Sequence, residues 1–582
     1  MSATERSHFR TAQRPPDPLT DAGSQLAALA HLASIAEEQA RAYADPRLPH
    51  ELSGEPPGTW VNRDDPWAEF DLPIGRPNPL WERWSPAPSR RPTGEMVALR
   101  TDWHGTVAGA PGSVVDTQAL AALRESSPLA VLPPRDFRVT APEPKPVRVL
   151  LAGVITGAVL GSVLALHLYR MPDGHIALHL NAYGIAVSTL IGFKLILSML
   201  AVPSRDTPAN RAVVAQAHVS AIITCHNEDP AAFSRCLDTL AAQSRMPDSV
   251  TVIDDASSDA ACARIALNRA AEFRALGIDY KLIRFRENQG KREGLAAGFR
   301  RIPHATGYLC IDSDTILDRF AAERLLRPFG NPKVMAVTGS VLSANRNRNL
   351  LTRLIDLRYA YAFMGERAAY SVLGSVLCVC GSAAMYRGTA VHKHLDKFLN
   401  QTFLGKKCTY GDDRHMTFWC LKEGKVLLAP DAVAWTLVPE RMSHFLRQQV
   451  RWSKSFFRES LWVVVKMPPT RIAWWLTMIE VGTWLGFTAA LLYSLTVRPV
   501  MTGHFAAMTY IVSALLLSYA RSGHYTEAHH PHMTWRGRIF TLLIAPLYGI
   551  IHMTLLLPLR VVALLTLRDN KWGTRKTVEV EA

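Results

Sequence analysis

Long apolar runs are the feature that most limits how this chain can fold. The runs at 149–169, 176–202 and 472–497 are apolar over about 20 residues or more, the length that a helix needs to cross a bilayer. Two further apolar runs lie at 504–520 and 539–567. Mean hydropathy is nevertheless close to zero, because polar segments separate these runs. We therefore expect a chain that is neither wholly disordered nor wholly embedded in a membrane.

The order of the runs predicts which segments share a compartment. The first two runs are joined by RMPDGH, a tight hairpin, so the block at 204–470 returns to the side of the N-terminal segment. The run at 539–567 has basic residues on both flanks, which is typical of two cytosolic flanks. Because Pro546, Gly549 and Pro558 interrupt it, we expect a broken or re-entrant hairpin, with a single helix as the alternative.

The N-terminal quarter of the chain predicts little packed structure. Residues 1–146 carry PP, GEPPG, RPNP and APEPKP strings, so we expect a mostly disordered arm with a local helix near its start. The N-terminus lacks the apolar core of a cleaved signal, so the first apolar run must itself insert. We expect these parts: 1–146 arm, 147–203 two spans, 204–440 catalytic domain, 441–470 interfacial helix, 471–568 C-terminal membrane region and 569–582 cytosolic tail.

Charge and cysteine content exclude two classes of site. The net charge of +15 lies largely beside the apolar runs, as the positive-inside bias predicts, and no compact basic stripe with interleaved aromatics suggests nucleic acid. The eight cysteines have no CxxC pair and no zinc spacing. We therefore expect reduced cytosolic thiols and no nucleic-acid partner.

Short Val/Ile-rich runs alternate with helical patterns between the membrane runs. HVSAIIT, SVTVIDD, YKLIRF and GYLCIDSD read as strands, and helices are expected near 231–244, 260–274 and 291–302. This alternation is typical of a parallel α/β sheet with crossover helices. Ligands of such sheets bind beyond the carboxyl ends of the strands.

Acidic residues follow two of these strands. Asp254 and Asp255 end one strand and Asp312 and Asp314 end a later one, so all four are expected at one edge of the sheet. An Asp-x-Asp pair at a strand end suits Mg²⁺ or Mn²⁺, with coordination positions left for phosphate oxygens. The competing interpretation is a set of solvated loop carboxylates.

Two helix starts carry charged residues that suit a reaction at this edge. Lys291 and Arg292 in GKR could bind a pyrophosphate, although simple helix capping and solvation explain them equally well. In YGDDR, Asp412 or Asp413 could accept a proton from a hydroxyl, while helix capping is the competing explanation. One carboxylate can cap while the other catalyses.

Basic and aromatic residues precede the third membrane run. FLRQQVRWSKSFFRESLWVVV predicts an amphipathic helix at the membrane interface, in which Trp452 is either a membrane anchor or a stacking platform for a sugar. Lys194 and Glu480 lie inside apolar runs and are expected to face protein or water in a lined tunnel, unless they snorkel to a helix end.

Taken in order, the motifs resemble those of a known family. ITCHNEDP, VIDDASSD, GKREGLAAGFR, DSD, GSAAMYR, NQTFLGKKCTYGDDR and QQVRW resemble the membrane-embedded processive inverting glycosyltransferases. The fold implied is an α/β GT-A-like cytosolic glycosyltransferase domain inserted between α-helical transmembrane segments. NQTFLGKKCTYGDDR, RQQVRWSKSFFRE and KWGTRK look most like hyaluronan synthases, with chitin and chitooligosaccharide synthases as near relatives.

The resemblance implies a role for each motif residue. It implies nucleotide-sugar binding by Asp254, Asp255, Glu228, Lys291, Arg292, Arg451, Trp572 and Arg575. It implies Mg²⁺ or Mn²⁺ binding by Asp314 and Asp312, and catalysis by Asp413 as general base beside Asp412. It implies acceptor binding by Trp452, Gln448 and Cys408, with the thiol not acting as a nucleophile. One departure is Ala256, where the family usually has Gly.

The activity implied is alternating transfer from UDP-GlcNAc and UDP-GlcA, with export of the nascent polysaccharide through the enzyme's own channel. We expect a monomer that spans the plasma membrane several times, with the catalytic domain and both termini cytosolic. A chitin or chitooligosaccharide synthase that uses UDP-GlcNAc alone is the first alternative. A catalytically silent membrane scaffold is the remote one.

Overall fold

The computed structural model describes residues 153–154, 157–158, 161–162, 175–503, 507–530 and 533–568. The arm expected at 1–146 and most of the first membrane run lie outside these residues. The tail at 569–582, with Trp572 and Arg575, lies outside them too.

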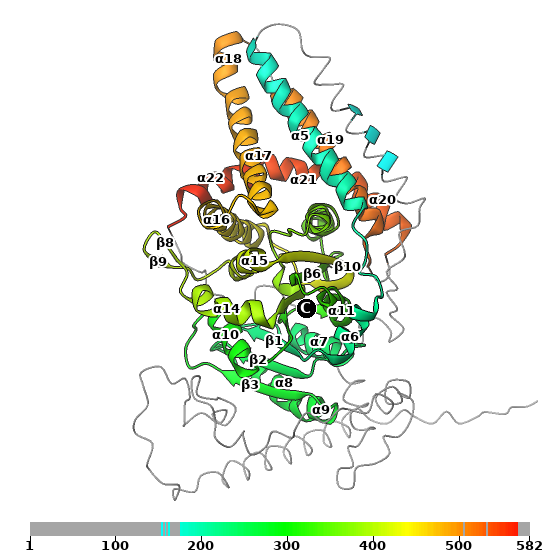
Figure 1. The fold of residues 1–582 in the computed structure, drawn as a ribbon. Coiled ribbons are helices and arrows are strands. Elements are labelled where there is room, and N and C mark those ends of the chain that lie inside the picture. The colour runs from blue at the N-terminus through cyan, green and yellow to red at the C-terminus, as the bar shows by residue number, and fades with distance from the viewer. Residues whose placement is uncertain are drawn as a thin grey trace, which may run out of the picture. The chain divides into compact units, whose positions relative to one another are not determined.

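An eight-stranded sheet forms the centre of the described chain (Figure 1). The strand order is β3-β2-β1-β4-β7-β6-β10-β5. The strands are β1 Val219–Cys225, β2 Ser249–Asp254, β3 Asp279–Arg284, β4 Gly307–Asp312, β5 Ile316–Leu317, β6 Val334–Ser343, β7 Ala384–Arg387 and β10 Lys425–Thr436. The four strands expected from the sequence are thus confirmed as β1 to β4.

The expected parallel sheet is only half right, because the sheet is mixed. Strands β1 to β4 pair in parallel, and β6 pairs in parallel with β10. The short β7 runs antiparallel to both β4 and β6, and β5 runs antiparallel to β10. A strand of four residues carries too little periodicity to be recognised in a sequence, and its direction is set by partners far away in the chain.

Helices cover the sheet where the sequence predicts them. The helices of this part are α6 Pro208–Gln216, α7 Pro230–Ala241, α8 Ala261–Asn268, α9 Ala270–Ala275, α10 Lys291–Arg301, α11 Ala321–Leu326, α14 Gly388–Leu399 and α15 Asp412–Glu423. Helix α10 packs tightly on β1, because a Cβ on Gly298 would come within 2.7 Å of Ile222 Cγ2. This close approach fixes the start of α10, and therefore Lys291, at the carboxyl edge of the sheet.

Several helices lie between the sheet and the apolar helices (Figure 1). They are α12 Leu350–Ala360, the π-helical turn η3 Tyr361–Arg367, α13 Ala368–Val372 and α16 Met442–Lys466. Helix α16 confirms the amphipathic helix expected around the QxxRW motif, and the ring of Phe457 on it packs edge-on against Trp484 of the next helix, centroids 4.6 Å apart.

The apolar helices project from one side of this part of the chain (Figure 1). They are α5 His175–Met199, α17 Ile472–Leu495, α18 Val497–Thr502 and α19 Ala507–Ser522. By length and composition, two helical stretches within the described residues could cross a membrane, Ile472–Met501 and Trp535–Leu565, and a shorter apolar helix covers Ile185–Met199.

The hairpin expected at 539–567 is not formed. Four helical segments follow one another end to end: α20 Trp535–Leu543, α21 Ala545–Ile551, the π-helical turn η6 His552–Leu556 and α22 Leu557–Leu565. Pro546 and Pro558 each lie in the first turn of a new segment, where the missing N–H is tolerated. The prolines therefore break the run into segments without reversing it, as in the single-helix alternative.

Candidate active site

The carboxylate of Asp312, at the end of β4, lies at the centre of the site. Its Oδ1 contacts the ammonium of Lys291, the first residue of α10. Its Oδ2 accepts a hydrogen bond of 2.9 Å from the hydroxyl of Ser382. Gly381 allows this approach, because a Cβ there would lie 2.9 Å from the Lys291 nitrogen and 3.1 Å from Asp312 Oδ1.

The same ammonium reaches the GDD motif. Lys291 Nζ lies 3.7 Å from Asp412 Oδ2, at the start of α15. The helix begins after Gly411, whose φ of +86° is a left-handed conformation suited to glycine, and neither aspartate is the capping residue. Asp412 and Asp413 are instead the first two residues of the helix, where the helix dipole favours negative charge.

Burial and crowding of charge set the pKa values here. Burial alone would lower the pKa of the Lys291 ammonium, but Asp312, Asp412 and Asp413 outweigh it and hold the pKa well above its usual value. For Asp413, burial and then the neighbouring Asp412 raise the pKa to about 6, although Lys291 opposes the shift. A carboxylate with a pKa in this range is suited to accept a proton near neutral pH.

A small pocket lies beside Lys291, Asp412 and Asp413. It has about 10 Å³ of space, enough for about one water molecule. It is lined by Lys291, Leu295, Cys310, Ile311, Gly381, Ala384, Tyr386, Asp412, Asp413 and Met416. Residues from α10, β4, β7 and α15 therefore converge at one point, although their motifs are far apart in the sequence.

The residues around the DSD motif are compatible with a metal ion that is bound mainly by its substrate. Asp314 Oδ1 accepts a hydrogen bond of 3.0 Å from the hydroxyl of Thr436, and Ser313 donates one of 2.9 Å to Glu228 Oε2. Within the described ranges, no cluster of three or more Asp, Glu, His or Cys side chains forms a metal cage. Mg²⁺ is commonly held by one or two carboxylates together with substrate phosphates, so Asp312 and Asp314 fit such an ion.

The first pair of aspartates shapes loops at the strand ends. Asp254 is 1% exposed and accepts hydrogen bonds from Arg284 Nε at 3.0 Å and from the Ser257 N–H at 3.0 Å. Asp255 accepts from the N–H groups of Gln289 and Gly290, at 2.7 and 2.8 Å. Burial raises the pKa of Asp255, and these two hydrogen bonds oppose that shift. Asp255 thus ties the end of β2 to the loop that precedes Lys291.

The turn after Asp255 carries the departure from the family pattern. Ala256 has a φ of +54°, a conformation that costs an alanine roughly 1–2 kcal/mol relative to the right-handed region. This explains why glycine is the usual residue there, and no functional group is lost with the change.

Arg292 lies beneath the site rather than beside Asp312. It is 4% exposed, and its guanidinium donates to the carbonyls of Phe398 and Tyr410, both at 3.2 Å, and to Gln401 Oε1 at 2.7 Å. These contacts hold the loop that leads into the GDD motif. The side chain points into the domain from the second position of α10, and nucleotide binding by Arg292 stays a prediction.

The residues of the QxxRW motif lie on α16. Trp452 is 41% exposed, and its ring centroid lies 6.4 Å from that of Tyr359 at an angle of 34°. Gln448 Oε1 is buried and has no hydrogen-bond partner among the residues that the structure describes. Arg451 is half-buried one position before Trp452. An exposed ring beside an unsatisfied buried oxygen can accept a polar, flat-faced ligand such as a sugar.

Cys408 is buried among charged groups. It is 1% exposed, and burial raises the pKa of its thiol, although Arg458 and Arg292 oppose the shift. The thiol is therefore not activated as a nucleophile. Its backbone N–H donates to the carbonyl of Gln401 at 2.9 Å, so it belongs to the loop before the GDD motif.

A buried polar network connects α16 to this loop. Glu459 accepts from Gln401 Nε2 at 2.8 Å and from His415 Nδ1 at 2.9 Å, and the indole N–H of Trp419 donates to His415 Nε2 at 3.1 Å. Arg458 contacts the carbonyl of Tyr410. His415 directly follows the GDDR motif, and Arg458 and Glu459 lie in the segment around QxxRW, but the sequence assigned none of them a role.

Three more residues of the site carry no sequence signal that could have found them. Thr436 ends β10, Arg284 ends β3, and Tyr359 lies within α12, outside every motif. Only Ser382 lies within a recognised motif, GSAAMYR. Each of these residues has its partner in a distant part of the chain. The partners are Asp314, Asp254, Trp452 and Asp312, and the largest separation is the 122 residues between Thr436 and Asp314.

Comparisons with known proteins place the chain in a family. The family described as "Glycosyltransferase like family 2" matches residues 216–455. The chain is 33% identical over 405 residues to a hyaluronan synthase of Streptococcus pyogenes serotype M3, covering 68% of this chain and 91% of that protein. It is 34% identical over 393 residues to an N-acetylglucosaminyltransferase of Rhizobium sp. (strain N33), covering 66% of this chain and 84% of that protein.

Among solved structures, a mannosyltransferase from Pyrobaculum calidifontis in complex with GDP-Man and Mn²⁺ aligns with a TM-score of 0.42 and 17% identity, over 64% of this chain and 98% of that chain. The mixed sheet and the family match together define a GT-A-like glycosyltransferase fold. Because the chain spans 91% of a relative that is 33% identical, it belongs to the hyaluronan synthase group of glycosyltransferase family 2 and is a glycosyltransferase.

Proposed function

We propose that this glycosyltransferase polymerises hyaluronan from UDP-GlcNAc and UDP-GlcA and exports the chain through its own membrane helices. The observation that carries the proposal is the position of Trp452. Its exposed ring lies on α16, which contacts the GDD loop through Arg458 and the apolar helix α17 through Phe457. An acceptor sugar stacked there would lie between the carboxylates and the apolar helices.

The reaction we propose is a single displacement at the anomeric carbon, which inverts its configuration. Asp413 takes the proton of the attacking acceptor hydroxyl, and its pKa of about 6 leaves it ionised at neutral pH. Lys291 and Arg451 would stabilise the charge that develops on the leaving diphosphate. Asp312 and Asp314 would hold Mg²⁺ or Mn²⁺, which supplies further charge neutralisation there. Cys408 takes no part in bond making.

We propose that three side chains, Trp452, Gln448 and Tyr359, form the acceptor sugar site. The resemblance implies the first two and not Tyr359. Trp452 stacks on one face of the acceptor, and Gln448 Oε1, which has no hydrogen-bond partner among the described residues, accepts a hydrogen bond from a sugar hydroxyl. Tyr359, whose ring centroid lies 6.4 Å from that of Trp452, forms a wall of the same site. Asp255 and Glu228 are proposed to position the loops around the nucleotide, while Asp254 and Arg292 support those loops from below.

A cluster of charges among the apolar helices favours an anionic product. Lys194 contacts Glu480, Arg358 donates to Glu366 at 3.2 Å, and Arg521 lies over the ring of Tyr361 at 5.5 Å. Arg560 interacts electrostatically with Glu366 and Glu480. The cationic cluster, defined here as Lys194, Arg358, Arg521 and Arg560 with Glu366 and Glu480, thus holds four cations and two carboxylates. Charges among membrane helices commonly face a polar path, and excess positive charge suits a polymer with a carboxylate on every second sugar.

We propose that Ile472–Met501, Trp535–Leu565 and α5 serve as membrane segments, which makes the lipid bilayer a partner and places the enzyme in the plasma membrane. A polymer of hydroxyls and carboxylates cannot cross hydrocarbon unaided, because each desolvated polar group costs several kcal/mol. A path lined by the cationic cluster would remove that cost. Cytosolic termini, a gate formed by Trp572 and Arg575, and action as a monomer are part of the same proposal.

The runner-up is a chitin or chitooligosaccharide synthase, which the 34% identity to an N-acetylglucosaminyltransferase supports. Membranes that contain the protein are incubated with UDP-GlcNAc, with UDP-GlcA, and with both, in the presence of Mn²⁺. Polymer formed only with both donors and degraded by a hyaluronan-specific lyase is the expected result. A chitinase-sensitive product from UDP-GlcNAc alone would identify the runner-up instead. Asp413→Asn membranes are the negative control.

A further inference from the structure

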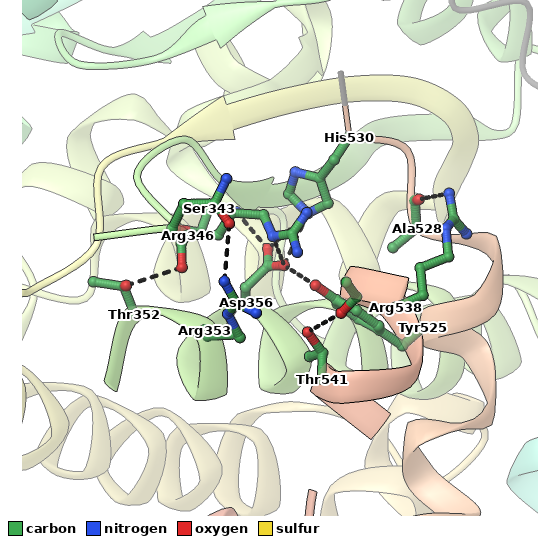
Figure 2. Close-up of polar contacts among 12 residues, drawn as sticks. Ser343, Arg346, Thr352, Arg353, Asp356, Tyr525, Ala528, His530, Arg538 and Thr541 are labelled. Carbon is green, nitrogen blue, oxygen red and sulfur yellow. Dashed lines mark hydrogen bonds and ion pairs between the residues drawn. The ribbon is translucent and has the colours of Figure 1, made fainter. Parts of the chain in front are cut away.

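A buried acidic residue of α12, Asp356, lies among side chains from other segments of the chain (Figure 2). Asp356 is 0% exposed and accepts hydrogen bonds from three segments of the chain. The Ser343 N–H donates at 2.9 Å, the Tyr525 hydroxyl at 2.7 Å and His530 Nε2 at 2.8 Å. Arg346 Nε lies 3.8 Å away.

The donors compensate for the burial of this charge. Burial alone would raise the pKa of Asp356, but His530 and the hydrogen bonds from Tyr525 and Ser343 outweigh it and hold the pKa below its usual value. The carboxylate is therefore ionised in the folded protein. A buried carboxylate with several charge-assisted hydrogen bonds is costly to break, because any lost partner leaves a charge or a donor unmatched.

Two of the three donors come from the segment between the last apolar helices. Tyr525 and His530 lie at 523–530, after α19 and before α20. Arg538 of α20 donates to the carbonyl of Ala528 at 3.0 Å and also contacts that of Thr526, which holds this segment against the C-terminal helices (Figure 2). Asp356 thus joins the catalytic domain to the C-terminal apolar region.

The segment at 523–530 is connected to two parts of the site, Asp314 through Trp435 and Thr436, and Tyr359 through Asp356. Trp435 Nε1 donates to the carbonyl of His529 at 3.1 Å, and the next residue, Thr436, donates to Asp314. On the other side, Asp356 lies one helical turn before Tyr359, the residue whose ring faces Trp452. Helix α12 therefore carries the buried carboxylate and one wall of the acceptor site on successive turns.

We propose that Asp356 is a positioning residue that holds α12 between the C-terminal segment and the catalytic domain, so that Tyr359 keeps the acceptor sugar against Trp452. The proposal rests on the acceptor site of the proposed function. In this proposal the joint, defined as the contacts among Asp356, Tyr525 and His530, keeps the end of the growing polysaccharide bound between sugar additions. Its loss weakens acceptor binding and shortens the product, while donor binding is unchanged.

The test separates acceptor from donor parameters in the full-length protein in membranes. Asp356→Ala should raise the KM for an added hyaluronan oligosaccharide about 10- to 100-fold, the cost of a misplaced binding group, and leave the KM for each UDP-sugar unchanged. Asp356→Asn keeps one acceptor oxygen and should recover much of the loss. Asp396→Asn, at an exposed carboxylate of α14, is the matched control and should behave like the parent protein.

A double-mutant cycle tests whether Asp356 acts through Tyr359. If it does, Asp356→Ala should add little to the acceptor KM once Tyr359→Ala is present, whereas independent structural damage would add in full. Should Asp356→Ala fail to fold, Tyr525→Phe and His530→Leu each remove one hydrogen-bond donor to Asp356, and the acceptor KM of these variants is compared in the same way. Lower thermal stability with unchanged acceptor KM and product length would overturn the proposal.

The experiments distinguish a failure of the proposed polymerase function from a failure of the role of Asp356. Parent protein that transfers single sugars but builds no polymer would overturn the polymerase proposal, and the acceptor KM would still decide the role of Asp356. Polymer of normal length from every variant of the joint would overturn the role of Asp356 alone.

Discussion

A single ammonium group serves three carboxylates at the site. Lys291 contacts Asp312, lies 3.7 Å from Asp412 and interacts electrostatically with Asp413. One cation cannot neutralise three crowded carboxylates, so the least compensated one keeps a raised pKa. That residue is Asp413, at about 6. The geometry of four side chains therefore prepares one carboxylate for proton transfer.

The pH dependence of transfer should report this carboxylate. Because Asp413 must be ionised to accept a proton and its pKa is raised to about 6, kcat/KM should fall as the pH drops through about 6 and level off above it. Asp413→Asn should abolish transfer at every pH while UDP binding survives, since no charge is removed from the proposed metal pair. Both are measured by radiolabelled sugar transfer and by calorimetric titration with UDP.

Asp412→Asn provides the control for that profile. Removing the neighbouring negative charge should lower the pKa of Asp413, because Asp412 is one of the groups that raise it. The acid limb should therefore move to lower pH with activity retained. An acid limb that stays near the parent value in Asp412→Asn, or one that lies near pH 4 in the parent protein, contradicts the assignment.

At the scale of elements, helix α16 contacts both the loop before the GDD motif and the apolar helix α17. It carries Trp452 on an exposed face, packs on α17 through Phe457 and holds the loop before the GDD motif through Arg458 and Glu459. Its contact with Gly411 is especially close, because a Cβ there would lie 2.4 Å from Ser455 Oγ and 3.2 Å from Arg458 Nη2. The start of α15 is therefore positioned by α16.

Gly411→Ala should displace the start of α15 and with it the proposed base. The new methyl group meets Ser455 in addition to the left-handed backbone cost, so we expect a loss of roughly 2–4 kcal/mol in stability and a large fall in kcat. Thermal unfolding and transfer rates measure the two effects. Gly405→Ala is the matched control, since Gly405 also has positive φ, at +78°, but a Cβ there meets no atom within 4 Å.

The control separates the clash from backbone strain. Gly405→Ala should lose only about 1–2 kcal/mol of stability and keep its transfer rate. Ser455→Ala combined with Gly411→Ala removes the closest contact and should restore part of the activity. Equal losses in the two glycine variants would show that α16 does not position the GDD motif.

At the scale of the whole molecule, charges from distant segments gather among the apolar helices. The cationic cluster draws its members from α5, α17, α19, α22 and the continuous stretch of α12 and η3, which are separate segments of the sequence. Lys194 and Glu480, expected from the sequence to face protein or water, contact each other, and the hydroxyl of Tyr370 donates to Glu480. The excess of positive charge is a property of this assembly and not of any one helix.

Arg521→Gln and Arg560→Gln should slow elongation of the anionic polymer. Each removes one cation from a poorly solvated cluster, where a charge contact contributes on the order of 1 kcal/mol or more, so we expect roughly fivefold slower chain growth. The rate is measured as polymer length against time in membranes. Arg568→Gln, at an exposed arginine beyond α22, is the control and should leave growth unchanged.

The measurement also distinguishes the two products. If the polymer is neutral chitin, loss of a cation gives no electrostatic penalty, and the rates of both variants should match the control. Unchanged growth of a lyase-sensitive polymer would show that the cationic cluster does not line its path.

Local sequence determined the strands, the helices and the motif ends of this protein. β1 to β4, α10, α15 and α16 follow from periodicity and turn signals that act within about ten residues, and the carboxyl ends of parallel strands must meet at one edge. That is why Asp312 and Lys291 could be expected near each other. The family could likewise be predicted from the order of the motifs, because each motif is a short local pattern of the sequence.

Tertiary packing decided what those signals do not contain. The antiparallel β7, the inward side chain of Arg292, the segmented helix at 535–565 and the contacts of Asp356 with Tyr525 and His530 all depend on partners far away in the chain. Asp356 and His530 are 174 residues apart. A local pattern specifies the backbone conformation of its own residues. The partner of a buried charge is set only by tertiary packing, because a buried charge without a partner costs too much free energy for the fold to tolerate.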